Sequence, residues 1–322
     1  MEFLKTDTAI RVRGNYRSAG FMLGLAVWAL PAAALGQQAQ PEQQPPAAAP
    51  GQAPEGSVGG MGDVNLYPKR VVLTDRDRTA TIGLYNRADA TGDYDITITD
   101  MTMLPDGRLV DLGTVNDPAV KARVKTATSL LRWSPHRVTL PANEAQLVRI
   151  MVRVPPDLPP GEYRSHFSAI AVPPQTGGIS IEQATGNAPA GSGVGVTIMP
   201  RFGIAIPIIV RVGDTTLTSG LKDIQVARTA AGEPVVRLVV TRAGTRSSFG
   251  NIAVTSAGSK KPIAEIKGIG VYPEIDQRSV QIPIDQKADP ALYARGAKLT
   301  VTYTDDDFAP GQTLAKEDFV VP

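Results

Sequence analysis

The stretch GSGVGVTIMPRFGIAIPIIVR, residues Gly191 to Arg211, decides how the rest of the chain is interpreted. Its first half alternates apolar residues with small or polar ones, and this period of two predicts a strand with one apolar face. Pro200 and Pro207 interrupt the second half, and because proline cannot donate to a sheet ladder, the pattern indicates an edge strand. An apolar strand at a free edge invites pairing with another chain. We therefore expect a donor strand, with its apolar side chains at Val194, Val196 and Ile198.

The N-terminal 36 residues have the features of an export signal. A basic start (Lys5, Arg11, Arg13 and Arg17) precedes an apolar run from Gly20 to Leu35, and small residues stand before Gln37. The alternative is an uncleaved membrane anchor, but the run is short for a span, so cleavage is favoured. No membrane span is expected after cleavage. Residues 37–60 are rich in Gln, Pro, Ala and Gly, which predicts a disordered tether.

Composition excludes several classes of function. The chain has 33 basic and 31 acidic residues and no cysteine. Subtracting four basic and two acidic residues of the signal from the formal charge of +2 leaves a mature chain near neutrality. Neutrality argues against nucleic acid as a partner and against an anionic membrane surface. The absence of cysteine excludes disulfides, thiol catalysis and thiolate metal sites, so stability must come from a packed core.

The remaining sequence predicts an all-β fold. Short alternating segments with turn signals between them are typical of a sandwich or barrel, and one short helix is possible within 117–128. A second set of strands begins near Gly213, so we expect one β domain over 61–212 and another over 213–322. The predicted strands are 64–73, 78–85, 94–103, 130–133, 138–140, 146–154, 163–172, 217–228, 235–242, 250–255, 263–272, 279–284 and 298–303.

One segment resembles a known family. The run LLRWSPHRVTLPANEAQLVRIMVRVPPDLPPGEYRSHFSAIAVPP, residues 130–174, is similar to the core of the PapD-like periplasmic pilus-assembly chaperones. The matching pieces are Ser134-Pro135, QLVR at 146–149 and GEYRSH at 161–166, and YPKRVVL at 67–73 resembles the family's first strand. The similarity covers most of 63–322 and is more diffuse in the second half.

This resemblance implies a fold and a function. It implies two immunoglobulin-like β-sandwich domains in tandem with a cleft between them. It also implies a non-enzymatic chaperone of the periplasm, without cofactor or metal. Such a chaperone donates an edge strand to pilin-like subunits that lack a terminal strand, and delivers them to an outer-membrane usher. The competing hypothesis is a structural or adhesive surface protein that binds a partner or a glycan, and an enzyme is the least favoured class.

The resemblance also implies two cations that hold the subunit's terminal carboxylate. They fall on Arg70 in the first strand and on Arg201 at the end of the donor strand. Arginine suits this role because its guanidinium can hold a carboxylate through two parallel hydrogen bonds. The sequence departs from the family pattern at the second position, where lysine is usual and Pro200 shifts the register. The alternative for each is a surface arginine that shields apolar neighbours.

Other chemical sites are weakly supported. His136 and His166 lack further ligands at metal-binding spacing, so both are expected to be structural. Asp305 to Asp307 lacks the spacing of a calcium loop and is expected to be a solvated turn. There is no Gly-x-Ser-x-Gly elbow and no phosphate-binding loop. Tyr163 begins a late strand, the position of a tyrosine that fixes a sandwich corner through its hydroxyl.

Overall fold

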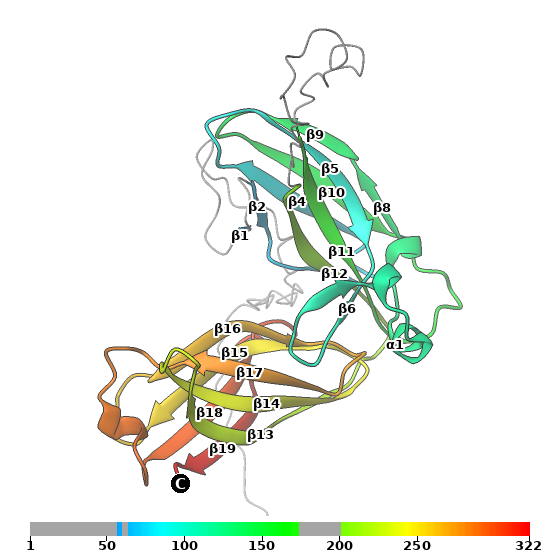
Figure 1. The fold of residues 1–322 in the computed structure, drawn as a ribbon. Coiled ribbons are helices and arrows are strands. Elements are labelled where there is room, and N and C mark those ends of the chain that lie inside the picture. The colour runs from blue at the N-terminus through cyan, green and yellow to red at the C-terminus, as the bar shows by residue number, and fades with distance from the viewer. Residues whose placement is uncertain (1–56, 60–63, 174–200) are drawn as a thin grey trace, which may run out of the picture. The chain divides into compact units, whose positions relative to one another are not determined.

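The computed structural model describes residues 57–59, 64–173 and 201–322. Within these ranges the regular structure is almost entirely β, which confirms the predicted fold class (Figure 1). The expected signal, nearly all of the expected tether and the predicted donor residues Val194, Val196 and Ile198 lie outside the described residues.

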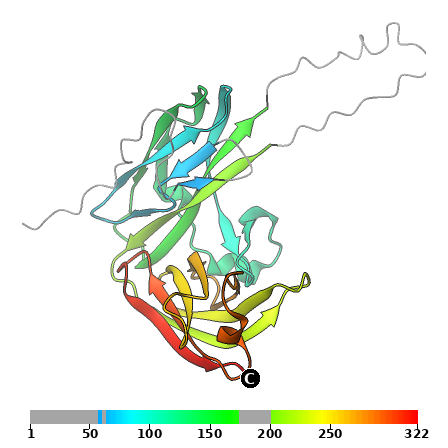
Figure 2. The same cartoon turned by 90° about the vertical axis from the view of Figure 1, so that its left-hand side faces the viewer.

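The first sandwich consists of two five-stranded sheets (Figures 1 and 2). One has the order β1 (Val58–Gly59), β2 (Val64–Tyr67), β4 (Thr79–Asn86), β10 (Ala145–Val152) and β8 (Leu131–Ser134). The other has the order β3 (Val71–Leu73), β12 (Gly203–Val212), β11 (Gly161–Val172), β5 (Gly92–Thr99) and β9 (Arg137–Leu140). Alternate residues face inward, as the period-two pattern predicts, and they form one buried core that includes Leu84, Ile150, Ile96, Phe167 and Ile206.

The predicted strand 64–73 is divided between the two sheets. β2 ends at Tyr67, before Pro68, and β3 begins at Val71 in the opposite sheet. Pro68 has no N–H to donate, so a ladder is interrupted there. This crossing places Arg70 immediately before β3, where that strand joins the free side of β12.

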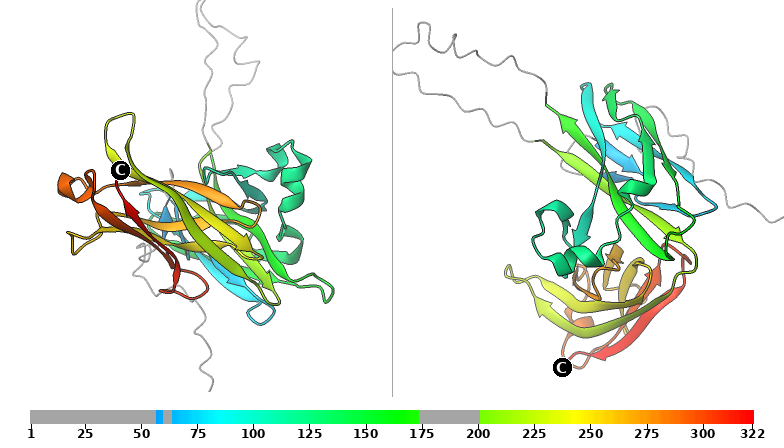
Figure 3. Two further views of the ribbon diagram at one scale, coloured as in Figure 1. Left: turned by 90° about the horizontal axis from the view of Figure 1, so that it is seen from below. Right: turned by 90° about the vertical axis from the view of Figure 1, so that its right-hand side faces the viewer.

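An irregular segment joins β5 to β8. It contains a small hairpin of β6 (Met101–Met103) and β7 (Leu109–Asp111), and then the helix α1 (Pro118–Arg123), all visible in Figure 3. The helix lies inside 117–128, the range in which one short helix was expected. Its start is fixed by Asp117, whose carboxylate accepts a hydrogen bond from the Ala119 N–H at 2.8 Å.

The second sandwich packs a three-stranded sheet against a four-stranded one. The first has the order β13 (Leu217–Arg228), β14 (Pro234–Gly244) and β17 (Gln277–Pro283). The second has the order β16 (Ala264–Val271), β15 (Ser248–Ser256), β18 (Lys298–Asp305) and β19 (Thr313–Val320). Leu238, Val254 and Tyr303 are buried in its core.

Strand β19 was not predicted from the sequence. It forms one edge of the four-stranded sheet, and Lys316, Glu317 and Asp318 are exposed in succession. This run of charges conceals the period of two, and charged side chains are a common way to protect an edge from pairing.

The two sandwiches meet in a region that we call the seam. The described residues fall in one compact unit, and a separate apolar cluster joins residues of both sandwiches: Met103, Ile209, Phe249 and Tyr272. Apolar contacts of this kind, together with the ion pairs described below, bring side chains from distant parts of the sequence to the end of β12.

Candidate functional site

Half of strand β12 has an open edge. On one side β12 pairs with β11 over its full length, but on the other side β3 pairs only with Ile208, Ile209 and Val210. Within the described residues, no strand pairs with that side of the segment from Gly203 to Pro207. This part of the chain therefore offers backbone groups for another strand.

The register between β11 and β12 identifies which backbone N–H and C=O groups of β12 point to the unpaired side. The N–H of Ala171 on β11 donates to the carbonyl of Phe202 at 2.8 Å. Because backbone groups of successive strand residues point to opposite sides, even-numbered residues of β12 bond toward β11 and odd-numbered ones point outward. The N–H and C=O groups of Gly203 and Ala205 thus lie at the open edge. Pro207 has no N–H, so the donor positions end there.

The apolar face of β12 belongs to the core of its own sandwich in the described part. Ile206, Ile208 and Val210 are buried there, and Ile204 is partly buried against them. Phe202, just before the strand, is 41% exposed. The predicted donor residues 194–198 precede this segment in the sequence and lie outside the described residues.

The open edge ends beside Arg70. Val71, the next residue, pairs with Ile208, which directly follows Pro207. A strand added along Gly203 to Pro207 and running parallel to β12 would therefore end at the position of Arg70 in the chain.

Carboxylates of the same chain already surround the guanidinium of Arg70. Arg70 Nη2 donates to the backbone oxygen of Asp306 at 2.7 Å and to its Oδ1 at 2.9 Å, and Arg70 Nε lies 3.3 Å from Asp307 Oδ1. Lys69 Nζ contacts the second carboxylate oxygen of Asp306 at 2.6 Å. Burial raises the pKa of Asp306, but these two cations outweigh it and hold the pKa below its usual value. The Phe249 ring lies beneath the guanidinium, at 4.5 Å.

A second arginine completes a buried network at the seam. Arg211 on β12 pairs with Glu162 on β11 at 3.3 Å and with Asp307 through a short contact. Glu162 also accepts hydrogen bonds from the N–H and hydroxyl of Ser247. Burial lowers the pKa of Arg211, but the two carboxylates raise it by more, so the guanidinium stays charged.

The prediction of a solvated turn at Asp305 to Asp307 is therefore wrong. The side chains of Asp306 and Asp307 are 11% and 6% exposed and face arginines of the first sandwich. The carboxylate of Asp305 accepts hydrogen bonds from the backbone N–H groups of Asp307, Phe308 and Ala309. These bonds hold the loop in place, so that the next two carboxylates point to the seam.

Arg201 does not join Arg70. Its guanidinium is half exposed and contacts Asp95 at 3.1 Å and the carbonyl of Ala171 at 3.3 Å. Ile208 lies seven positions after Arg201, and at about 3.3 Å per residue this is about 23 Å along the strand. One carboxylate cannot contact two cations so far apart.

Solved structures similar to this chain include chaperones. They include the YadV chaperone (13% identity, covering 80% of this chain and 100% of that chain, TM-score 0.40) and the Pseudomonas aeruginosa CupB2 chaperone (14%, 80% and 100%, TM-score 0.38). A third is the Salmonella enterica SafA pilin in complex with the SafB chaperone (16%, 82% and 99%, TM-score 0.38). No family model and no curated protein matches the sequence.

His166, on β11, is fully buried, and its ring lies near Tyr272 of the second sandwich. Neither ring nitrogen has a hydrogen-bond partner among the described residues, and the ring centroid lies 6.2 Å from that of Tyr272. Burial, together with the nearby Arg164 cation, lowers the pKa of His166 to about 3. The imidazole is thus neutral near pH 7, as a structural histidine would be.

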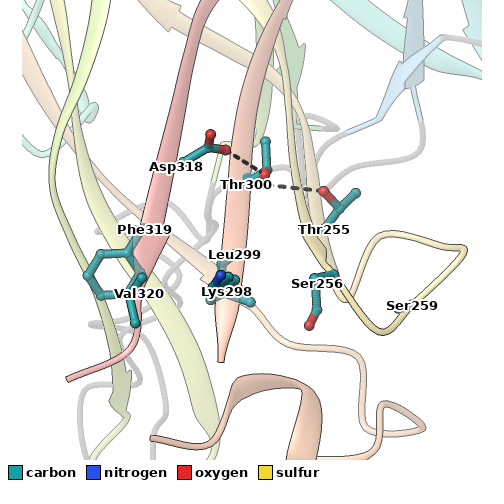
Figure 4. A pocket seen from close by; sticks show the side chains of 10 residues that line it. Thr255, Ser256, Ser259, Lys298, Leu299, Thr300, Asp318, Phe319 and Val320 are labelled. Carbon is teal, nitrogen blue, oxygen red and sulfur yellow. Dashed lines mark hydrogen bonds between the residues drawn. The ribbon is translucent and has the colours of Figure 1, made fainter. Parts of the chain in front are cut away.

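A hollow on the second sandwich offers little chemistry. Figure 4 shows it between the ends of β15, β18 and β19, with Lys298, Phe319 and Val320 in its wall. The carboxylate of Asp318 already accepts a hydrogen bond from the Thr300 hydroxyl at 2.6 Å.

Over residues 57–59, 64–173 and 201–322, no cluster of three potential metal-binding side chains occurs. In the same ranges, none of the helices has the length and apolar character needed to span a bilayer.

Proposed function

We propose that this chain is a periplasmic chaperone that captures pilin-type subunits lacking a terminal strand. The observation that carries the proposal is the open edge of β12 from Gly203 to Pro207, which ends beside Arg70. Strand addition to such an edge provides main-chain hydrogen bonds to a client, and alternating side chains provide specificity.

The donor residues predicted from the sequence lie upstream of the described part of β12. Val194, Val196 and Ile198 have the same even numbering as Ile204 and Ile206, so a strand without a bulge would place them all on one face. In a client groove, burial of three such side chains contributes on the order of 5–8 kcal/mol before the cost of ordering the segment. That is enough to hold an otherwise unstable subunit in solution.

Arg70 recognises the client's terminal carboxylate in this proposal. The donor edge and this cation are adjacent, so one extended client strand can engage both. Arg201 is too distant to assist Arg70, and its proposed role is limited to contacts near the start of β12. Release to an outer-membrane usher would proceed by exchange of the donated strand for a client strand that fits the groove better.

Co-expression with a pilin-type subunit from the same organism tests the proposal. A chaperone yields a soluble complex with one copy of each chain, and Arg70→Ala weakens it. An adhesive surface protein, the alternative function, leaves the subunit aggregated, and that result would overturn the proposal.

A further inference from the structure

The position at which a client carboxylate would arrive is occupied by Asp306. This side chain is 11% exposed and that of Arg70 is 10% exposed, so their pairing is largely shielded from water. The contact joins the loop after β18 to the residue before β3, which are 236 positions apart. An ion pair shielded in this way is screened by salt much less than a surface pair.

The geometry of the guanidinium makes Asp306 compete with a client carboxylate for the same Arg70 nitrogen. A carboxylate grips arginine with two parallel hydrogen bonds, either through Nε and Nη2 or through the two Nη atoms, and both arrangements need Nη2. Arg70 Nη2 donates to the backbone oxygen and to Oδ1 of Asp306, and Nε faces Asp307. A client carboxylate can bind Arg70 in a bidentate manner only after the hydrogen bonds from Arg70 Nη2 to Asp306 are broken.

Lys69 offers Asp306 a second cation. Its ammonium contacts Oδ2 of Asp306 at 2.6 Å, and the Lys69 side chain is 46% exposed, so it can follow the carboxylate outward. Asp306 can leave Arg70 and keep a counter-ion. The exchange therefore avoids a buried unpaired charge, which would cost several kcal/mol.

We propose that Asp306 is a built-in competitor for the client's terminal carboxylate at Arg70. The inference rests on the proposed function. In the absence of client, the internal carboxylate satisfies the arginine and excludes small free carboxylates. A client strand displaces it because the strand also gains main-chain hydrogen bonds along β12, which a lone carboxylate does not.

The test uses Asp306→Asn, which removes the charge but keeps the shape and the backbone oxygen. The probes are two synthetic peptides with the sequence of the terminal strand of the co-expressed subunit, one ending in a free carboxylate and one in an amide. By calorimetry, the variant should bind the carboxylate peptide roughly tenfold more tightly than the wild type does, and the amide peptide equally well. Asp318→Asn, an equal charge change far from the site, should alter neither affinity.

Three results would overturn the inference. If Asp306→Asn binds the carboxylate peptide no more tightly than the wild type, Asp306 is not a competitor, although the proposed function stands. If the wild type binds neither peptide and forms no complex with the subunit, the proposed function fails and the inference fails with it. If both peptides gain affinity equally, the variant acts on the edge strand and the carboxylate exchange is rejected.

A measurement on the wild type covers the case in which Asp306→Asn does not fold. Hydrogen exchange of the loop from Asp305 to Ala309 should become faster when the carboxylate peptide binds, because Arg70 then leaves the backbone oxygen of Asp306. The amide peptide should produce no such change. Equal exchange with both peptides would contradict the displacement.

Discussion

The guanidinium of Arg164 and the carboxylate of Glu274 lie 2.6 Å apart at the seam, although 110 positions separate them in the sequence. Both side chains are 3% exposed. The Arg164 guanidinium also lies over the Tyr272 ring, at 3.5 Å, and Glu274 accepts the Met103 N–H at 2.9 Å. This pair therefore links β11, the β6–β7 hairpin and the second sandwich.

Glu274→Gln should destabilise the protein strongly. It leaves the Arg164 charge buried without a counter-ion, so we expect a loss of about 3–5 kcal/mol in the free energy of unfolding, measured with urea. Arg137→Met removes only exposed contacts at 3.8 Å, and it should cost about 1 kcal/mol or less. Equal losses in the two variants would contradict a special role for the seam pair.

Acid should destabilise the fold through His166. Its folded pKa of about 3 lies below the ordinary value of 6.5, so between these pH values the unfolded chain binds the proton and the folded chain does not. Stability should therefore fall as pH decreases from 6.5, by up to about 1.4 kcal/mol per pH unit. Unfolding titrations at pH 7, 6 and 5 measure the slope.

The two histidines provide a matched control for this slope. His166→Leu should reduce it, whereas His136→Leu, at an exposed position, should leave it unchanged. A wild-type slope that persists in His166→Leu would assign the acid sensitivity to other groups.

Tyr163→Phe should cost about 1 kcal/mol, measured by thermal unfolding. The hydroxyl donates to the carbonyl of Pro159 at 2.9 Å, four residues earlier in the chain. This is the corner contact expected from the position of Tyr163 at the start of a late strand. Unchanged stability would show that the hydroxyl bond is replaced by water at no cost.

Much of the fold could be predicted from the sequence, because apolar and polar residues alternate in strands that have one buried face. β10 and β11 were predicted within about two residues at each end, which is ordinary for boundaries. β19 was missed because consecutive charges hide its period.

The candidate site was predictable only in part. Arg70 was proposed from a local run of residues. The acidic partners Asp306 and Asp307 were not found, because their partners Arg70 and Arg211 are 236 and 96 positions away. No local pattern records such pairings. The distance between Arg70 and Arg201 likewise depends on the register of β3 with β12.

Gly107→Ala should destabilise more than Gly232→Ala. Both glycines have positive φ, at 87° and 84°, so the backbone strain is similar. A Cβ at Gly107 would overlap the guanidinium of Arg278, whereas a Cβ at Gly232 would have nothing within 4 Å. The excess loss in urea unfolding should be about 1 kcal/mol or less, because the guanidinium is the end of a flexible side chain and can move aside. Equal losses would indicate that the hairpin turn does not pack on Arg278.

The most direct test of the account is subunit capture by Val196→Asp. A charge on the donated face should abolish co-purification of the pilin-type subunit, because an unpaired carboxylate cannot be buried in an apolar groove. The unfolding midpoint should match that of the wild type. Val320→Asp, the same change at a valine that is 55% exposed in the second sandwich, should capture normally. Normal capture by Val196→Asp would contradict the donor-strand account.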